Sequence, residues 1–521
     1  MVAAGGTIAA STSALRPPPP ADYREVVVAV HRPLLLDPLF GRDDPAVRDV
    51  GHLLYRSLLR LDGDGQPVAD LADAWSVSSD GHTYAFMLPV GQRWSDGSSV
   101  TARDVAATVS LVQSADFPDS RLGEAWRDVA VNVESPVTLT MRLRRPRGAF
   151  ATTVAELPIL PTAAIAHPAA QLARTASRPI PTSGPYRVGA SDSSALHLVA
   201  NPHAARPPPL RTVELRLASS FHDALRAYAG GGADAILATT PGQRAEVRSV
   251  PGTTVHDMLS FRTVQLLFNT ASASAGLDQV GVRHAIGAAV DRPGLVAAVL
   301  PGAGLPQADP IPLGIRWIPH PAVGGPNLPL AERMLDVAGW RAPLSGEVRS
   351  QGAAQLDERL IVSDEEPLPA VARHLAHQLR PLGVQVEVNL VPPSRFFGLL
   401  TAPRKEWDLA IADVDNGPDP DISSQWRSDE VPPKGVNVTG LRPDFVVDRA
   451  LDRLGMETDP KLRRAAAVEV DRDLAARAPA VFLYAPRVTL ATSDALVIPL
   501  PASGSSAQRY DLVSGWRRLP R

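Results

Sequence analysis

The sequence has no cysteine among its 521 residues. Disulfide bonds, thiolate nucleophiles, iron–sulfur clusters and zinc sites with cysteine ligands are therefore excluded. No run approaches the roughly 20 apolar residues that a membrane-spanning helix needs. The net charge is only −3, from 52 basic and 55 acidic side chains, so the strongly basic balance of a nucleic-acid-binding domain is missing. Aromatic residues make up 5% of the chain, which leaves few platforms for stacking a ligand.

The rest of the composition is that of a folded protein. Apolar residues account for 45% and charged residues for 21%, close to the globular averages of about 45–50% and about 25%. At roughly 150 residues per domain, the length predicts about three structural units. The 51 prolines indicate many ordered turns and strand edges.

Residues 1–22 read differently from the rest of the chain. The first 15 residues carry no charge, and Arg16 is followed by four prolines at 17–20. A secretory signal has a basic start, an apolar core and a small-residue cleavage site; only the last two are faintly present. Two interpretations stay open, a flexible leader or the remnant of a signal that starts upstream. We expect the fold to begin near Tyr23.

Hydrophobic periodicity divides the first half of the chain into short elements. It predicts strands over 25–30, 82–88, 129–133, 137–143, 186–188, 195–199, 212–217 and 233–237. Helical spacing predicts helices over 50–61, 101–112 and 221–229. Thr101 with Asp104 three residues on forms a capping-box-like helix start.

The second half alternates strands and helices more regularly. Helices are predicted over 282–290, from Asp291 onward, and over 330–338, 368–382 and 394–401; strands are predicted over 359–363, 384–391 and 407–412. Gly339 and Gly383 follow two of these helices in the C-terminal capping position. This alternation predicts an α/β fold with largely parallel pairing.

A series of short motifs follows one another over most of the chain, from about Val26 to Tyr484. In this order it resembles the extracellular solute-binding proteins of the peptide/nickel ABC-importer family, the dipeptide- and oligopeptide-binding proteins. The motifs are Leu71-Ala72-Asp73-Ala74-Trp75, residues 79–86, Trp94-Ser95-Asp96-Gly97, residues 101–105, Thr182-Ser183-Gly184-Pro185-Tyr186, Gly231-Gly232-Ala233-Asp234-Ala235, Phe268-Asn269-Thr270, residues 282–286 with Asp291-Arg292, Gly304-Leu305-Pro306, residues 331–340 and the acidic loop 413–421.

The resemblance implies a two-lobed periplasmic-binding-protein fold of the Venus-flytrap type, in the large peptide-binding class. Lobe I would comprise 23–261 plus 485–521, with an extra subdomain at about 50–178, and lobe II would comprise 262–484. It implies a monomeric protein outside the cytoplasm that captures a short peptide or other small solute between its lobes and delivers it to an ABC-importer permease. An alternative stays open: the chain also resembles actinobacterial proteins with this fold that act as cell-envelope regulators or scaffolds. Such a protein would bind a partner protein and no transported solute.

The segment 412–421 is the most informative one for function, because it follows a predicted strand and carries four aspartates within nine residues. Ligands of open α/β sheets bind at the carboxyl ends of strands. Three interpretations compete: a calcium loop, a solvated turn and an amine clamp. The helix–loop–helix calcium motif has glycine at its sixth position and glutamate at its twelfth. Counted from Asp413, glycine is at the fifth position and Ser424 at the twelfth, so the segment departs from this motif.

The resemblance favours the amine clamp. In dipeptide binders, an aspartate of a similar stretch pairs with the peptide's α-amine, and Asp415 stands at that position. The departures are Pro418, which is inserted here, and Ala412, where many relatives have tryptophan. The predicted ligand-binding residues are Asp413, Asp415, Asn416, Gly417 and Asp419.

Other residues are weaker candidates for a binding or catalytic site. His374 and His377 share a helix face without a nearby third ligand, so surface histidines are favoured over a metal pair. Arg283 is expected to make structural salt links more often than ligand contacts. No nucleophile elbow, zinc-protease motif or paired carboxylates stand out. We therefore expect no enzyme activity, no cofactor, no metal and no nucleic-acid partner.

Overall fold

The computed structural model describes residues 21–42, 44–165, 168–272, 276–342, 348–441 and 444–520. The leader or signal interpretation of residues 1–22 falls almost entirely outside these described residues. The predicted start near Tyr23 coincides with the first strand, β1.

The first 260 residues form a set of short strands and helices. They are β1 (Tyr23–Val28), α1 (Pro45–Leu54), β2 (Leu59–Leu61), β3 (Pro67–Ala69), β4 (Ala74–Val77), β5 (Thr83–Met87), α2 (Ala102–Val112), α3 (Ser120–Trp126), β6 (Val129–Val133), β7 (Thr138–Leu143), α4 (Phe150–Ala155), η1 (Thr162–Ile165), α5 (Ala169–Ala173), β8 (Tyr186–Ser191), β9 (Ala195–Ala200), β10 (Thr212–Ala218), α6 (Phe221–Ala229), β11 (Ala235–Ala238), α7 (Pro241–Arg248) and β12 (Thr253–Leu259).

The remaining elements run to the C-terminus. They are β13 (Arg262–Phe268), α8 (Val280–Ala289), α9 (Arg292–Val299), β14 (Gly304–Pro306), α10 (Leu328–Val337), β15 (Ser350–Gln351), β16 (Ala354–Gln355), β17 (Asp357–Ser363), α11 (Leu368–Leu379), η2 (Arg380–Leu382), β18 (Gln385–Val391), α12 (Pro393–Thr401), β19 (Leu409–Asp415), α13 (Ser423–Trp426), α14 (Phe445–Met456), α15 (Pro460–Arg477), β20 (Ala480–Ser493), β21 (Leu496–Val497), η3 (Ser506–Tyr510), η4 (Val513–Gly515) and β22 (Arg517–Arg518).

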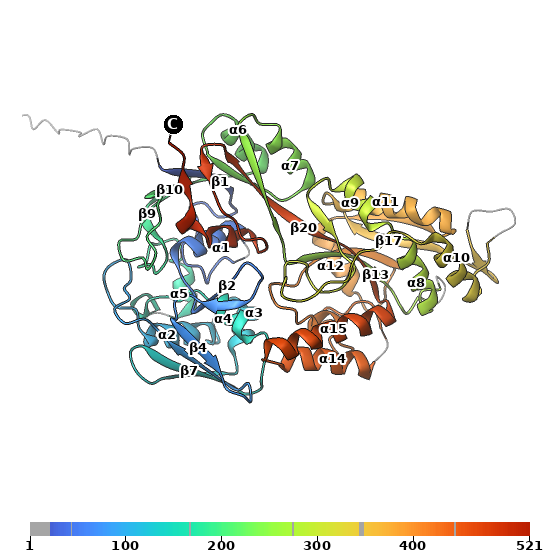
Figure 1. Cartoon of the computed structure of the whole chain (residues 1–521), viewed down its shortest axis with the longest axis horizontal. Helices are drawn as coiled ribbons and strands as arrows, with labels where there is room; N and C mark the ends of the chain where they lie inside the picture. Colours follow the sequence, from blue (N-terminus) through green and yellow to red (C-terminus); the bar gives the residue numbers. More distant parts are fainter. Residues whose placement is uncertain are drawn as a thin grey trace, which may run out of the picture.

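One long strand, β20, belongs to both lobes. Its first residues pair with β13 and β14, whereas residues 487–493 pair with β11 and β12. The sheet order is β18-β17-β19-β13-β20-β11-β1-β10-β9-β8. In Figure 1, β20 runs from the lobe that contains β1 and β10 to the lobe that contains β17 and α11. The chain passes between the lobes a second time at Ser260 and Phe261, between β12 and β13.

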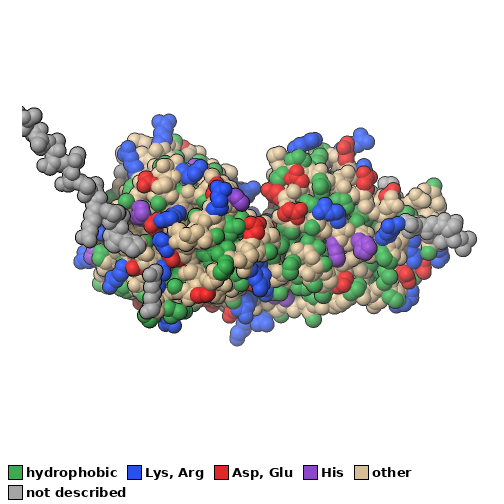
Figure 2. Space-filling view, turned by 90° about the horizontal axis from the view of Figure 1, so that it is seen from above, with side chains coloured by type: hydrophobic (Ala, Val, Ile, Leu, Met, Phe, Trp, Pro, Cys, Tyr) green, Lys and Arg blue, Asp and Glu red, His purple; other side chains and the backbone are tan. Residues whose placement is uncertain are grey.

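The fold is therefore the two-lobed, mixed α/β architecture that the sequence indicates. We propose that the lobes divide at these two crossings, with 23–261 plus 485–521 as lobe I and 262–484 as lobe II. Within lobe I, the separate sheet β4-β5-β7-β6 and helices α2 to α5 lie inside the segment that we assign to the extra subdomain. Figure 2 shows the molecule indented between the lobes.

Two local predictions were wrong. The helix predicted over 50–61 is α1, which begins earlier because the Asp44 carboxylate accepts a hydrogen bond from the N–H of Ala46. The chain leaves the helix at Tyr55, and Leu59 pairs with Ala69 in the β2–β3 hairpin. Among the strands of the described residues, parallel pairing is limited to β1 with β10 and β11 and to β17 with β18 and β19. The remaining pairs in the large sheet are antiparallel: the hairpins β8–β9 and β9–β10, the pairs with the shared strand β20, and the long-range pair β13–β19.

The helix starts read from the sequence were confirmed. The Asp104 carboxylate accepts hydrogen bonds from the backbone and hydroxyl of Thr101 at the start of α2. The Asp291 carboxylate accepts one from Gly294 in the first turn of α9. Gly339 and Gly383 adopt positive φ of 89° and 82°, which glycine tolerates at a helix end.

Candidate functional site

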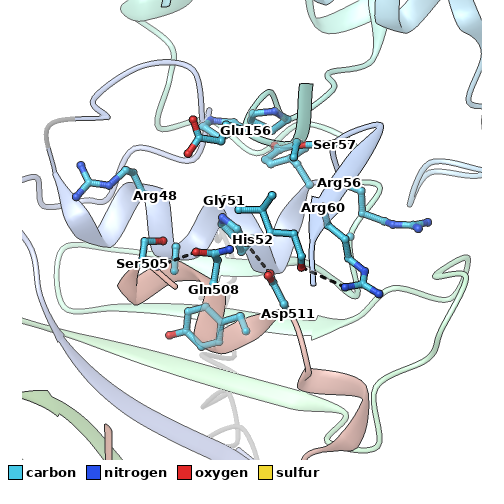
Figure 3. Close-up of a pocket in the computed structure, with 18 of the residues that line it drawn as sticks. Arg48, Gly51, His52, Arg56, Ser57, Arg60, Glu156, Ser505, Gln508 and Asp511 are labelled. Atoms are coloured by element: carbon cyan, nitrogen blue, oxygen red, sulfur yellow. Dashed lines mark hydrogen bonds and ion pairs between the residues drawn. The ribbon is translucent and has the colours of Figure 1, made fainter. Parts of the chain in front are cut away.

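A cavity of about 1070 Å³ lies between the two lobes. Lobe I contributes α1, β2, the ends of α3 and α4, and the C-terminal segment around η3, and lobe II contributes the loop after β19. Phe261, at one of the two crossings, completes the wall. Figure 3 shows His52, Arg60, Glu156 and Asp511 around this space. The position between two hinged lobes is where a binding protein of this architecture encloses its ligand.

Asp415 reaches this cavity from the end of β19. The strand extends three residues beyond its predicted end, so Asp415 is its last residue, opposite Arg262 in the register with β13. The Asp415 side chain is exposed, and one oxygen accepts a hydrogen bond from the Gly417 N–H at 3.0 Å. Asn416 donates its N–H to the Phe261 carbonyl at 3.3 Å, which ties the loop to the crossing. Within the described residues, Asp415 has no ion-pair partner.

The other predicted ligand residues have different surroundings. Asn416 and Gly417 line the cavity with Asp415, but Asp413 and Asp419 are not part of its wall. Two hydrogen bonds of 2.9 and 2.6 Å join the guanidinium of Arg262 to the Asp413 carboxylate. Burial raises the pKa of Asp413, although Arg262 lowers it. The ligand role of all five residues stays a prediction.

Asp419 takes part in a buried contact between the lobes. Its carboxylate forms two hydrogen bonds with Arg463 on α15 and accepts one from the Thr152 hydroxyl on α4 at 3.1 Å. The side chains of Arg463 and Asp419 are only 7% and 13% exposed. Asp421 accepts hydrogen bonds from the backbone N–H and the hydroxyl of Ser423, the first residue of the short helix α13. Three of the four aspartates are therefore hydrogen-bonded to protein side chains, and the described residues include no cluster of acidic and histidine side chains suited to a metal ion. The calcium interpretation consequently has no support.

Glu156 is a cavity residue that the sequence did not reveal. It follows α4, its side chain is exposed to the cavity, and its carboxylate has no hydrogen-bond partner among the described residues. Desolvation raises the pKa of Glu156, and the nearby carboxylates of Asp415 and Asp419 raise it further, against the opposing effect of Arg42. Glu156 and Asp415 therefore line the same cavity from opposite lobes. No sequence signal marks Glu156, because its partner lies some 260 positions away.

His52 adds a second titratable group to the cavity. Its Nδ1 lies 2.8 Å from the Asp511 carboxylate, a contact drawn in Figure 3. Desolvation lowers the pKa of His52, but Asp511, Asp49 and Glu156 outweigh it, so the pKa is raised. The C-terminal residues thereby form part of the cavity floor.

A family model for bacterial extracellular solute-binding proteins, family 5, matches residues 66–432, which is more than half of the chain. The chain belongs to this family. Protein XP55 of Streptomyces lividans is 28% identical over 466 residues, covering 87% of this chain and 81% of that protein. The oligopeptide-binding protein OppA of Mycobacterium tuberculosis is 26% identical over 409 residues, covering 73% and 65%.

Solved structures agree with the family assignment at the level of the fold. The periplasmic murein tripeptide-binding protein MppA, in an unliganded open form, superposes with a TM-score of 0.79 at 18% identity, covering 96% of this chain and 98% of that one. The scaffold alternative considered for the sequence receives no support from these comparisons. No helix in the described part of the chain has the length and apolar character needed to cross a membrane.

The remaining candidates of this solute-binding protein lie away from the cavity wall. Arg283 is buried and donates hydrogen bonds to the carbonyls of Ala478, Leu277 and Arg477, so its contacts are structural but are not salt links. His374 and His377 lie on α11. Ala412 does not line the cavity, whose aromatic residues are Phe40, Tyr55, Phe261 and Tyr510.

Proposed function

We propose that this solute-binding protein captures short peptides with a free α-amine and delivers them to an ABC-importer permease. The name of the OppA relative and the position of the cavity between two hinged lobes support this proposal. On the same grounds we propose that it works outside the cytoplasmic membrane, as a monomer and as a carrier that performs no catalysis.

The observation that carries the proposal is the Asp415 carboxylate at the cavity wall, without an ion-pair partner among the described residues and close enough to Glu156 to affect its pKa. Two neighbouring carboxylates repel each other in a closed cavity unless a cation lies between them. A buried ammonium in turn requires a partner. A charge-assisted hydrogen bond is worth about 1.5–3 kcal/mol, so the pair can decide whether a ligand needs a free amine.

Closure follows from the same contacts. A ligand shifts an open–closed equilibrium only by its preference for the closed state. An amine held between Asp415 of lobe II and Glu156 of lobe I touches both lobes and therefore favours closure. The extended backbone of a peptide can add hydrogen bonds that do not depend on its side chains.

Thermal denaturation with di- and tripeptides, each free and N-acetylated, tests the amine requirement. A bound peptide at 100 times its dissociation constant adds about 2.7 kcal/mol to the unfolding free energy. We expect free peptides to raise the melting temperature and acetylated ones to have little effect. Equal shifts by both forms would contradict the role of Asp415.

The variant Asp415→Asn separates binding from stability. We expect it to weaken amine-bearing peptides by about tenfold or more, since each 1.4 kcal/mol is tenfold in affinity, and to leave the unfolding free energy almost unchanged. Asp357→Asn is the matched control, because Asp357 is an exposed aspartate outside the cavity wall. A large loss of stability in Asp415→Asn would make Asp415 a structural residue.

A further inference from the structure

The cavity wall of lobe I is rich in arginine. Six arginines line it: Arg42, Arg48, Arg56, Arg60, Arg121 and Arg206. They come from separate stretches of the chain, and none belongs to the motifs that predict the family. Their charges bear on which peptides the cavity accepts.

Two of the six have carboxylate partners. Arg56 holds Asp70 through Nε at 3.1 Å and Nη2 at 2.7 Å. Arg42 lies 4.0 Å from Asp119. The guanidinium groups of the other four have no carboxylate partner within the described ranges.

Arg60 is the least exposed of these four. It lies on β2 opposite Val68 of β3, between the buried residues Leu59 and Leu61. Its own side chain is half-buried, and its single hydrogen bond runs from Nη1 to the Leu61 carbonyl at 3.2 Å. A guanidinium has five N–H donors, so most of its donors remain available to a ligand. Figure 3 shows Arg60 on the same side of the cavity as Asp511 and away from Glu156.

Among the cavity side chains that have no ion-pair partner in the described structure, positive charges outnumber negative ones. Four guanidinium groups stand against two carboxylates without ion pairs, Asp415 and Glu156, in the described wall. A peptide with uncharged side chains brings one ammonium and one carboxylate and leaves this excess unchanged. Closing the lobes removes water, and a desolvated cation without a partner is costly. A ligand with additional carboxylates supplies the missing partners, and arginine binds carboxylates bidentately.

We infer that the lobe I wall, with Arg60 at its centre, selects acidic peptides, whose side-chain carboxylates bind the arginines that lack partners. The inference rests on the proposed function and specifies its substrate class. The amine end lies at Asp415 and Glu156, and the anionic groups lie along β2 and its neighbours. Arg60 acts as a specificity-determining residue.

Titration calorimetry with matched tripeptides tests this inference. Ala-Glu-Ala and Ala-Gln-Ala differ in one charge at almost constant shape, and Ala-Lys-Ala reverses the charge. We expect Ala-Glu-Ala to bind at least about tenfold more tightly than Ala-Gln-Ala in the wild-type protein, and Ala-Lys-Ala to bind most weakly. Arg60→Gln should reduce the Glu-over-Gln ratio toward one while changing Ala-Gln-Ala affinity little.

Two further variants keep the test independent of folding defects. Arg206→Gln removes an exposed cavity arginine and should lower the ratio by a smaller factor. Arg464→Gln, at an exposed position outside the cavity wall on α15, should leave the ratio unchanged. Equal affinities of Ala-Glu-Ala and Ala-Gln-Ala in the wild type would overturn the inference and leave the proposed function intact.

Citrate, a carboxylate ligand without an amine, tests anion binding by the arginines independently of amine binding by Asp415. If citrate binds in an Arg60-dependent way and no peptide binds, the proposed function fails but the anionic preference of the wall stands. If neither citrate nor any peptide binds, both proposals are overturned.

Discussion

The two lobes arrange their charges around the cavity in a similar way with opposite signs, although Asp413 and Asp419 of lobe II lie outside the cavity wall itself. In lobe II, Asp413 is paired with Arg262 and Asp419 with Arg463, and Asp415 between them is left without an ion pair in the described structure. In lobe I, Arg56 and Arg42 have carboxylate partners, and Arg60 has none among the described residues. Among the described residues, paired charges therefore lie beside one unpaired carboxylate, Asp415, in lobe II and beside four unpaired arginines, Arg60 among them, in lobe I. A run of like charges in a sequence can therefore consist mostly of structural anchors.

The ion-paired arginines that fix the two lobes differ in how deeply they are buried. The floor of lobe I depends on Arg509, which is 1% exposed and contacts both Glu25 on β1 and Asp49 on α1. The hydroxyls of Tyr510 and Tyr23 also donate to Glu25, at 2.6 and 2.8 Å. The lobe II anchor Arg262 is 47% exposed. Substitutions of buried and of exposed anchors should therefore reduce the unfolding free energy by different amounts.

The largest effect is expected for Arg509→Met. The substitution leaves Glu25 and Asp49 buried without their cation, and breaking a buried pair in this way costs about 3–5 kcal/mol. Urea denaturation should show this loss, and peptide binding should fall with it, because η3 forms part of the cavity floor. A loss below about 1 kcal/mol would mean that the C-terminal segment adds little to lobe I. Arg517→Met, at an exposed arginine near the C-terminus, is the control.

A smaller loss, about 3 kcal/mol, is expected for Asp419→Asn, which leaves Arg463 buried without a full charge partner. The same change weakens the Thr152 contact across the lobes, so small-angle scattering should show a larger radius of gyration for the ligand-free protein. The comparison with Asp415→Asn is the decisive one, since the two aspartates are four residues apart. Equal stability of the two variants would contradict the division into anchor and ligand group.

The smallest effect concerns pH. The pKa of His52 is raised in the folded protein, so the His52–Asp511 pair stabilises the fold fully below the unfolded pKa of about 6.5. That contribution disappears as the pH rises through the higher folded pKa. His52 is 39% exposed, so solvent screening keeps the effect under about 1 kcal/mol. Unfolding free energies at pH 6 and pH 9 should differ less in His52→Gln than in the wild type, and an identical pH dependence would contradict the assignment.

The sequence predicted local features well. Helix α6 begins and ends where expected, and the β6–β7 hairpin pairs as predicted, because both depend on neighbours within a few residues. The loop after β19 was found for the same reason, although its strand runs to Asp415. The shared strand β20 and helices α14 and α15 were not predicted. The burial of β20 depends on strands far away in the chain, such as β11 and β12, whereas α14 and α15 pack against each other.

Only the cavity residues of lobe II could be predicted from the sequence. Asp415, Asn416 and Gly417 are contiguous, so a motif could indicate them. Glu156, His52, Arg60 and Asp511 come from four separate segments and become neighbours only after folding. Their chemistry could not be read from spacing.

The path of β20 has a consequence for how the chain is made. In the sheet of lobe I, β11 and β12 both pair with residues within 487–493, which leave the ribosome after the whole of the lobe II segment. Although most of lobe I is synthesised first, its sheet stays open at one edge until those residues arrive. The two lobes of this protein are therefore expected to complete their folding together, after translation of residue 493, instead of one after the other.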